Sequence, residues 1–186
     1  MESTEGLTDE HKEIAVFLAI IEEIANRLAS MKGARAEDLQ WLFEFNRDFV
    51  LRMHQGKEES LFFPVLRDIG VPEDPINILT GDHDALRGIA KTIRGLIEDY
   101  NSGDDGNVTS DLVDMLRFYA AFMKDHIEAE ETVFYPIADK CISRENDMRL
   151  AARLKVSGAE RIGIGRDEDL REILDSLKLF YGISKE

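Results

Sequence analysis

Hydrophobic residues recur at three- and four-residue spacing along most of the chain, which is the period of an amphipathic α-helix. In the first run, Ile14, Phe17 and Ile21 would share one helix face. No segment shows the alternation of a half-buried strand, so we expect an all-α protein. The pattern predicts helices over residues 7–31, 36–66, 75–100, 109–141, 143–155 and 167–181.

Capping and breaking residues divide these predicted helices. Thr8 and Ser143 are candidate N-caps, because their hydroxyls can accept from backbone N–H groups of the first turn, although the first helix could begin before Thr8. Pro64 should kink the second helix or begin its termination, since proline lacks a backbone donor. The glycine-containing segments 101–107 and 158–165 predict loops.

One motif occurs twice, as His54-Gln-Gly-Lys-Glu-Glu-Ser-Leu-Phe-Phe-Pro64 and His126-Ile-Glu-Ala-Glu-Glu-Thr-Val-Phe-Tyr-Pro136. A histidine and a glutamate four residues apart leave one helix face a turn apart and can bind one metal centre. The other histidines, His11 and His83, keep the same 72-residue offset. Four histidines in one duplicated frame favour a metal site. Hydrogen-bonded core histidines are the alternative, but buried imidazoles beside carboxylates would then need other partners.

The spacing of the histidines also predicts a topology. In antiparallel neighbouring helices, two residues at one level are equidistant from the loop between them. The midpoint between His11 and His54 falls in residues 32–35, where Gly33 interrupts the helical pattern, and that between His83 and His126 falls in the loop 101–107. We therefore expect an up-down-up-down antiparallel four-helix bundle, in which six groups converge at one height. These are His11, His54, Glu58, His83, His126 and Glu130.

Four imidazoles and two carboxylates favour a transition metal over calcium or magnesium, which prefer oxygen ligands. Six protein ligands are too many for one zinc, whose structural sites close at four. The set suits two ions, each bound by two histidines and both bridged by Glu58 and Glu130. We expect two irons with a bridging oxide or hydroxide, although zinc or manganese could occupy the same ligands.

Residues near the motif predict the surroundings of the centre. Carboxylates beside the ligands would orient the imidazoles, or would lie on a solvated face; they are Glu10, Glu59, Asp82 and Glu131. Apolar residues one turn away predict either a pocket for a small ligand or ordinary bundle core; they are Val50, Phe62, Phe122 and Phe134. Tyr119, a further turn from Phe122, is a candidate hydrogen-bond donor to the centre.

Charge and composition restrict the partners. The formal net charge of −15 argues against nucleic acid and anionic membranes, whose phosphates would repel the chain. The single cysteine, Cys141, excludes an internal disulfide and a cysteine-rich metal site. The first residues lack the features of a signal peptide, and no apolar run reaches the roughly 20 residues of a membrane span. We expect a soluble, cytoplasmic protein.

At the repeated motif the chain resembles the hemerythrin-like family, also called the HHE cation-binding domain. The resemblance covers about residues 7–141 and implies an antiparallel four-helix bundle with an oxo-bridged di-iron centre, in which the histidines are terminal ligands and the two glutamates bridge. Arg87 stands where oxygen-carrying members have a further histidine. We expect a bundle over residues 1–141, with helices of residues 142–186 packing on it.

The expected function is that of a non-haem di-iron protein that binds dioxygen, nitric oxide or peroxide for sensing, scavenging or carriage. One alternative is a di-iron peroxidase or oxidase, or a protein that repairs iron centres. Another is a structural metal site or an iron store. No further general acid, nucleophile or phosphate-binding loop stands out in the sequence to favour an enzyme.

Overall fold

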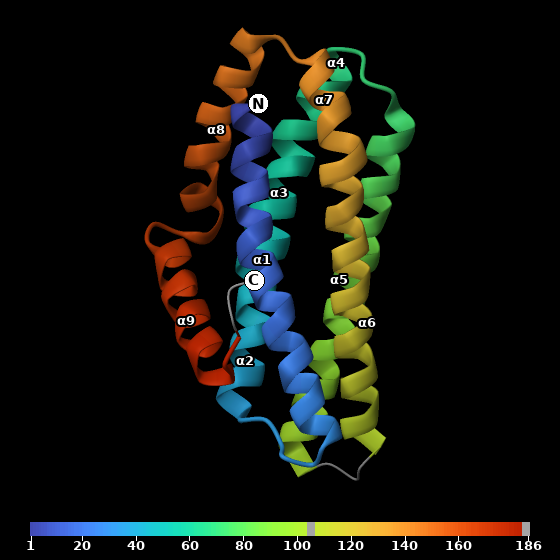
Figure 1. Cartoon of the computed structure of the whole chain (residues 1–186), viewed down its shortest axis with the longest axis vertical. Coiled ribbons are helices and arrows are strands. Elements are labelled where there is room, and N and C mark those ends of the chain that lie inside the picture. Colours follow the sequence, from blue (N-terminus) through green and yellow to red (C-terminus); the bar gives the residue numbers. More distant parts are fainter. Residues whose placement is uncertain (104–106, 184–186) are drawn as a thin grey trace.

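The computed structural model describes residues 1–103 and 107–183, and every regular element within them is a helix (Figure 1). The prediction of an all-α protein is therefore confirmed. Three π-helical segments interrupt the α-helices: η1 (Asn46–His54), η2 (Glu58–Phe62) and η3 (Glu130–Phe134). The α-helices are α1 (Glu2–Ala29), α2 (Ala36–Phe45), α3 (Gln55–Lys57), α4 (Phe63–Asp68), α5 (Glu73–Gly103), α6 (Asn107–Ala129), α7 (Tyr135–Cys141), α8 (Arg144–Ile162) and α9 (Arg166–Tyr181).

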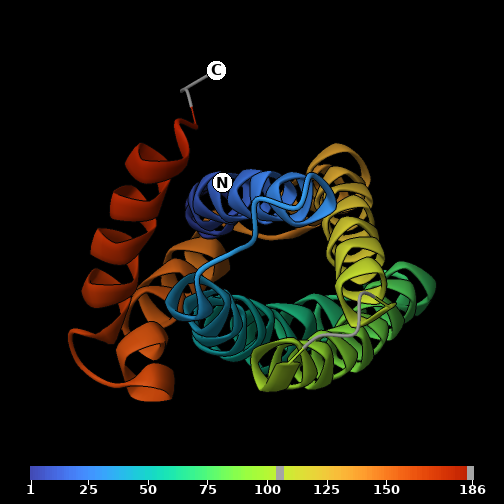
Figure 2. The ribbon, with the colours of Figure 1, turned by 90° about the horizontal axis from the view of Figure 1, so that it is seen from below.

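Four long helical segments surround a common core: α1, α2 to α4, α5, and α6 to α7 (Figure 2). Successive segments run in opposite directions, and α6 packs against both α1 and α5. The C-terminal helices α8 and α9 lie along α1 and α2, on one side of these segments. No helix of the described ranges is long and apolar enough to cross a membrane.

The two repeated motifs each contain a π-helical turn that begins at a glutamate. η2 starts at Glu58 and η3 at Glu130, and each is followed by a proline near the start of the next α-helix. Proline cannot donate to the preceding turn, so the locally wider hydrogen-bonding pattern accommodates Pro64 within a continuous helix that ends at Asp68. π-Helical turns of this kind often mark functional sites.

The N-terminus of α1 is capped from a distant helix. Asp147 of α8 accepts from the backbone N–H of Glu2 at 3.0 Å and of Ser3 at 3.1 Å. The prediction that Thr8 caps this helix is therefore wrong, because α1 begins before it and a long-range carboxylate binds the free N–H groups. Ser143 does cap α8, where its hydroxyl accepts from the backbone of Asn146.

The predicted loop 158–165 is also corrected. Gly158 lies inside α8, which continues to Ile162. A Cβ at Gly158 would lie 3.2 Å from Sδ of Met53 and 3.5 Å from Nζ of Lys57, so the glycine allows α8 to approach the bundle closely. Of the predicted loop 101–107, residues 101–103 belong to α5 and residue 107 to α6, while 104–106 lie outside the described residues.

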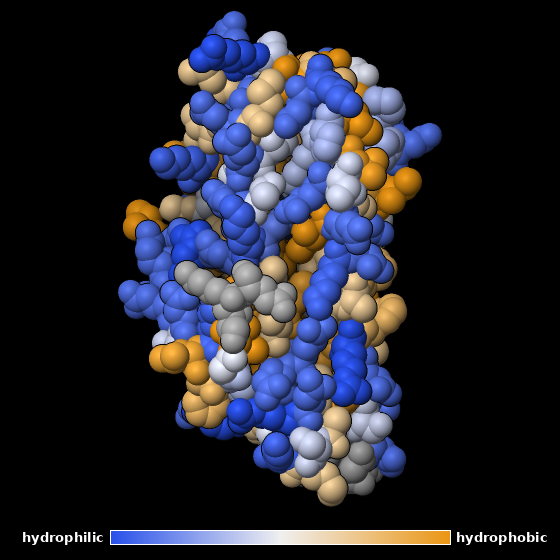
Figure 3. Space-filling model, viewed as in Figure 1, coloured by the Kyte–Doolittle hydropathy of each residue, from blue (hydrophilic) through white to orange (hydrophobic). Residues whose placement is uncertain are grey.

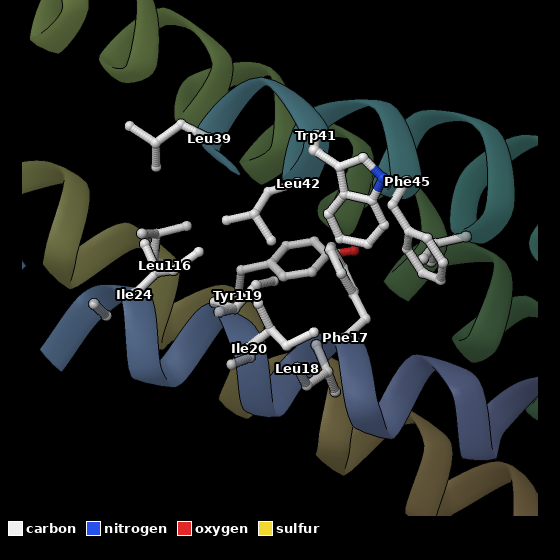
Figure 4. Packing of buried hydrophobic residues seen from close by; sticks show 14 of the residues in the cluster. Phe17, Leu18, Ile20, Ile24, Leu39, Trp41, Leu42, Phe45, Leu116 and Tyr119 are labelled. Atoms are coloured by element: carbon white, nitrogen blue, oxygen red, sulfur yellow. The ribbon is translucent and has the colours of Figure 1, made fainter. Parts of the chain in front are cut away.

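Two groups of buried hydrophobic residues lie on either side of the histidines along the helices. The larger group contains the packed side chains of Phe17, Leu42, Phe45, Leu116 and Tyr119 (Figure 4). The second, which includes residues 62, 63 and 134, packs at the other end, near α4 and α7. The face seen in Figure 3 is largely covered by polar and charged residues with scattered apolar ones. The polar layer that holds the histidines is thus enclosed by apolar residues.

Candidate metal centre

The four histidines form two pairs in the interior of the bundle. The Nε2 atoms of His11 and His54 lie 3.2 Å apart, and those of His83 and His126 lie 3.1 Å apart. Each histidine is at most 3% exposed. At this distance, the two nitrogens of a pair can share a hydrogen bond, or both can bind one cation that lies beside them.

Two buried glutamates lie between these histidine pairs. Glu130 has one oxygen near each pair, with Oε2 at 3.2 Å from Nε2 of His11 and Oε1 at 3.2 Å from Nε2 of His126. Oε2 of Glu58 faces both pairs, at 3.4 Å from Nε2 of His83 and 3.6 Å from Nε2 of His54. The structure therefore brings together all six residues that the repeated motif singled out.

The chemistry of these groups fits metal ions. Oε2 of Glu58 and both side-chain oxygens of Glu130 are buried, and they have no hydrogen-bond partner among the residues that the structure describes. A buried carboxylate without donors is unfavourable unless a cation or protonated group compensates its charge. Two sets of residues have ligand atoms within 4.8 Å of one another. One set is Glu58, His83, His126 and Glu130, and the other is His11, His54 and Glu130.

The carboxylates shift the pKa values of the histidines. Burial lowers the pKa of His11, but the nearby carboxylate of Glu130 outweighs burial and raises the pKa to about 9. At His83, burial is likewise outweighed by Glu58, and the pKa also rises to about 9. Burial raises the pKa of Glu130, yet its histidine partners hold it well below the usual range. Metal ions and protons therefore compete for the same imidazole nitrogens.

The second nitrogen of every histidine faces a carboxylate. Nδ1 of His11 lies 2.8 Å from Glu131, and Nδ1 of His83 lies 2.8 Å from Glu59. The other two contacts are His54 to Glu10, at 3.0 Å, and His126 to Asp82, at 3.3 Å. Such acceptors fix the orientation of an imidazole and leave Nε2 free to bind a metal. The alternative of a purely solvated acidic face does not describe these four carboxylates.

Two of the four outer carboxylates are paired with a cation. Lys57, which is buried beside α8, donates to Glu10. Arg87 donates to Glu59 and to Asp84, and so lies outside the ligand layer. Arg87 therefore stabilises the carboxylate that holds His83.

Tyr119 does not lie at the centre, so the prediction that it donates a hydrogen bond there is wrong. Its hydroxyl donates to Oδ1 of Asn46. The ring of Tyr119 lies within the larger hydrophobic group (Figure 4). Tyr119 precedes His126 by two turns of α6, which is a distance of about 10 Å along the helix axis. Burial raises its pKa above the usual range, so the hydroxyl stays protonated.

The four apolar residues expected near the ligands differ in exposure. Val50, Phe62 and Phe134 are buried, whereas Phe122 is half-buried and stacks obliquely on Phe118 at the edge of the core. Phe62 and Phe134, which occupy equivalent places in the two motifs, pack edge to face with their ring centroids 6.0 Å apart. These two rings close one side of the polar layer.

Sequence reasoning missed one residue at the centre, Tyr135. Its ring stacks on His11 with the centroids 5.7 Å apart, and its hydroxyl donates to Oε1 of Glu58 at 2.9 Å. The equivalent residue of the other motif, Phe63, stacks on His83 at 5.9 Å but has no hydroxyl. Aligning the two motifs could have identified Tyr135, because it has a hydroxyl where the first motif has the phenylalanine Phe63.

Comparison with known proteins agrees with this geometry. The family model of the hemerythrin HHE cation binding domain matches residues 3–138, which is most of the chain. The protein thus belongs to the hemerythrin HHE cation-binding family, whose members are helical domains that bind metal cations. No curated protein gave a match to the chain. The matched range ends before α8 and α9.

Proposed function

We propose that this protein is a non-haem di-iron protein that binds dioxygen, nitric oxide or peroxide for sensing, scavenging or carriage. One observation carries the proposal: within residues 1–103 and 107–183, three buried carboxylate oxygens without donors lie among four imidazole Nε2 atoms. The proposed ligands are His11 and His54 for one ion and His83 and His126 for the other, with Glu58 and Glu130 shared.

The composition of this ligand set supports a pair of irons. Imidazoles with carboxylates, and without a thiolate, suit iron, manganese or zinc. Two dicationic metals with a bridging oxide or hydroxide would compensate the charge of two buried carboxylates whose described neighbours are histidines and the hydroxyl of Tyr135. A bound iron pair would supply redox chemistry and open coordination positions for a small ligand.

The surroundings of the proposed centre support a small ligand. Buried aromatic and aliphatic residues enclose the polar layer on both sides, including Val50, Phe62 and Phe134. An apolar enclosure excludes water and admits small, weakly polar molecules more readily than charged ones. Because Arg87 binds Glu59 and not a metal, one ion would have a histidine fewer than in oxygen carriers, which favours sensing or scavenging over simple storage.

The net charge and the single cysteine bear on the partners and the location of the protein. The net charge of −15 disfavours nucleic acid and anionic lipid as partners, and we propose a cytoplasmic location because the single cysteine is free and exposed.

The test is metal analysis of the purified protein together with visible spectra recorded without and with air. We expect about two irons per chain and charge-transfer bands that change on addition of dioxygen, nitric oxide or peroxide. Sustained consumption of peroxide would instead favour an enzyme. Two zincs, or a folded protein that binds no metal, would contradict the proposal and favour a structural site.

A further inference from the structure

The duplicated motif allows the two halves of the centre to be compared atom by atom. Phe63 and Tyr135 follow their glutamates at the same spacing, and their rings stack on equivalent histidines with interplanar angles of 19° and 7°. The hydroxyl of Tyr135 is the polar atom that distinguishes them. A buried hydroxyl needs a hydrogen-bond partner, and this one is found within the centre.

Tyr135 contacts two of the proposed ligands. Its hydroxyl donates to Oε1 of Glu58 at 2.9 Å and lies 3.4 Å from Nε2 of His11. Tyr135 is 3% exposed, so water does not compete strongly for the hydroxyl. A hydrogen bond to a carboxylate is charge-assisted and gains strength in a buried environment. Oε1 of Glu58 therefore has a hydrogen-bond donor, whereas its second oxygen, Oε2, has none among the described residues.

The two glutamates therefore present different sets of free oxygens. Of their four side-chain oxygens, the three without a donor in the described part of the chain are Oε2 of Glu58 and both oxygens of Glu130. Glu130 has one oxygen for each histidine pair, whereas Glu58 has a single oxygen that faces both. The sequence repeat alone would make the two glutamates equivalent.

We propose that Tyr135 is a positioning residue that makes Glu58 bind the metal pair through Oε2 alone, while Glu130 binds it through both oxygens. This inference rests on the proposed function, since it concerns how the same site holds its metals. A single-oxygen bridge and a two-oxygen bridge hold two ions differently, so the two metal positions would be coupled by unlike bridges. Tyr135 would thus set the geometry of the pair without binding either ion.

The test compares Tyr135→Phe with the unmodified protein, and Tyr119→Phe is the matched control. Both substitutions remove one buried hydroxyl, but that of Tyr119 lies in the core on Asn46. Phenylalanine already occupies the equivalent place in the first motif, as Phe63, so the ring packing of Tyr135→Phe should persist. Melting curves verify that each variant folds.

Two measurements are made on each protein. Competition with a chelator gives the affinity for Fe²⁺ or Zn²⁺, and infrared difference spectra between metal-loaded and metal-free protein report the carboxylate binding modes. We expect Tyr135→Phe to bind two metals at saturation, with affinity lowered about 10–100-fold. In this variant, the infrared bands of the Glu58 carboxylate should become similar to those of Glu130, because Glu58 would gain a second oxygen without a donor. Tyr119→Phe should retain the affinity and the bands of the unmodified protein.

Three results would overturn the inference. If Tyr135→Phe binds two metals with unchanged affinity and bands, the positioning role is wrong while the proposed metal pair stands. If the ferric protein shows a tyrosinate charge-transfer band that Tyr135→Phe lacks, Tyr135 is itself a ligand. If the unmodified protein binds no metal pair, the proposed function fails and the inference fails with it.

Discussion

Glu131 lies 2.8 Å from Nδ1 of His11, although the two residues are 120 positions apart in the chain. Glu59 makes the equivalent contact with His83, also at 2.8 Å. In both cases the carboxylate that follows a proposed bridging glutamate holds a histidine of another helix. These contacts hold the histidines across neighbouring helices. Removing a bridging glutamate should therefore affect metal binding differently from removing the carboxylate that follows it.

Replacing Glu58 or Glu130 with alanine should abolish binding of the metal pair, because the carboxylate of each faces both histidine pairs. Glu59→Ala and Glu131→Ala should still bind two metals at saturation, with affinity lowered about 10–100-fold by loss of the imidazole acceptor. Metal analysis after gel filtration and chelator competition measure both effects. Equal metal loading in all four variants would contradict the assignment.

Asp9→Ala is the control for these glutamate variants. Asp9 precedes Glu10 on α1 but is exposed and pairs with Lys12. Its replacement removes a carboxylate close to the centre in sequence without removing a contact to a histidine, so metal content and affinity should stay unchanged.

Tyr119→Phe should lower the free energy of unfolding by about 1–3 kcal/mol, because Oδ1 of Asn46 would lose its buried donor. Metal content should not change, since this hydroxyl lies in the hydrophobic core. Urea unfolding and metal analysis of the same preparation separate the two effects. Loss of metal without loss of stability would place Tyr119 back at the centre.

Gly158→Leu should destabilise the protein by about 1–3 kcal/mol, because a side chain there would collide with Met53 and Lys57. Gly88→Ala is the matched control within a helix. Gly88 lies in α5 with nothing within 4 Å of an added Cβ, so alanine should stabilise by about 0.5–1 kcal/mol. Thermal unfolding of both variants measures the difference, and a stabilising Gly158→Leu would contradict the close packing of α8.

Asp147→Ala should lower the free energy of unfolding by about 0.5–2 kcal/mol, because two N–H groups at the start of α1 lose their acceptor. Urea unfolding at neutral pH measures this loss. Amide exchange at Glu2 and Ser3 should also become faster. Unchanged exchange at these two amides would mean that the cap does not form in solution.

The contribution of Asp147 should depend on pH. Burial raises its pKa, but the hydrogen bonds from Ser3 and Glu2 outweigh burial and lower the pKa below the usual value. A depressed pKa stabilises the folded state fully above the unfolded-state pKa of about 3.9 and loses that effect as the pH falls through the folded-state value. The difference in stability between Asp147→Ala and the unmodified protein should therefore shrink below about pH 4. A difference that is constant with pH would exclude this linkage.

The sequence by itself predicted the helical class and the four histidines and two glutamates that the helices bring together. A 3.6-residue period requires no knowledge of distant contacts, and the 72-residue repeat places every histidine of the chain in one frame. The same local reasoning identified Ser143 as a cap, because that hydrogen bond joins residues three apart. Predictions of this kind succeed where the partners lie within a turn or in a repeated register.

Only the tertiary structure decided which side chains of different helices meet. Asp147 displaces Thr8 as the cap of α1, Gly158 packs inside α8, and Tyr119 binds Asn46 in the core. Each of these contacts joins segments far apart in the chain, so no local pattern encodes it. The hydrogen bond from Tyr135 to Glu58 likewise joins two helices. The pattern of each helix can be predicted from its own sequence, but its polar side chains acquire partners on other helices only when the helices pack.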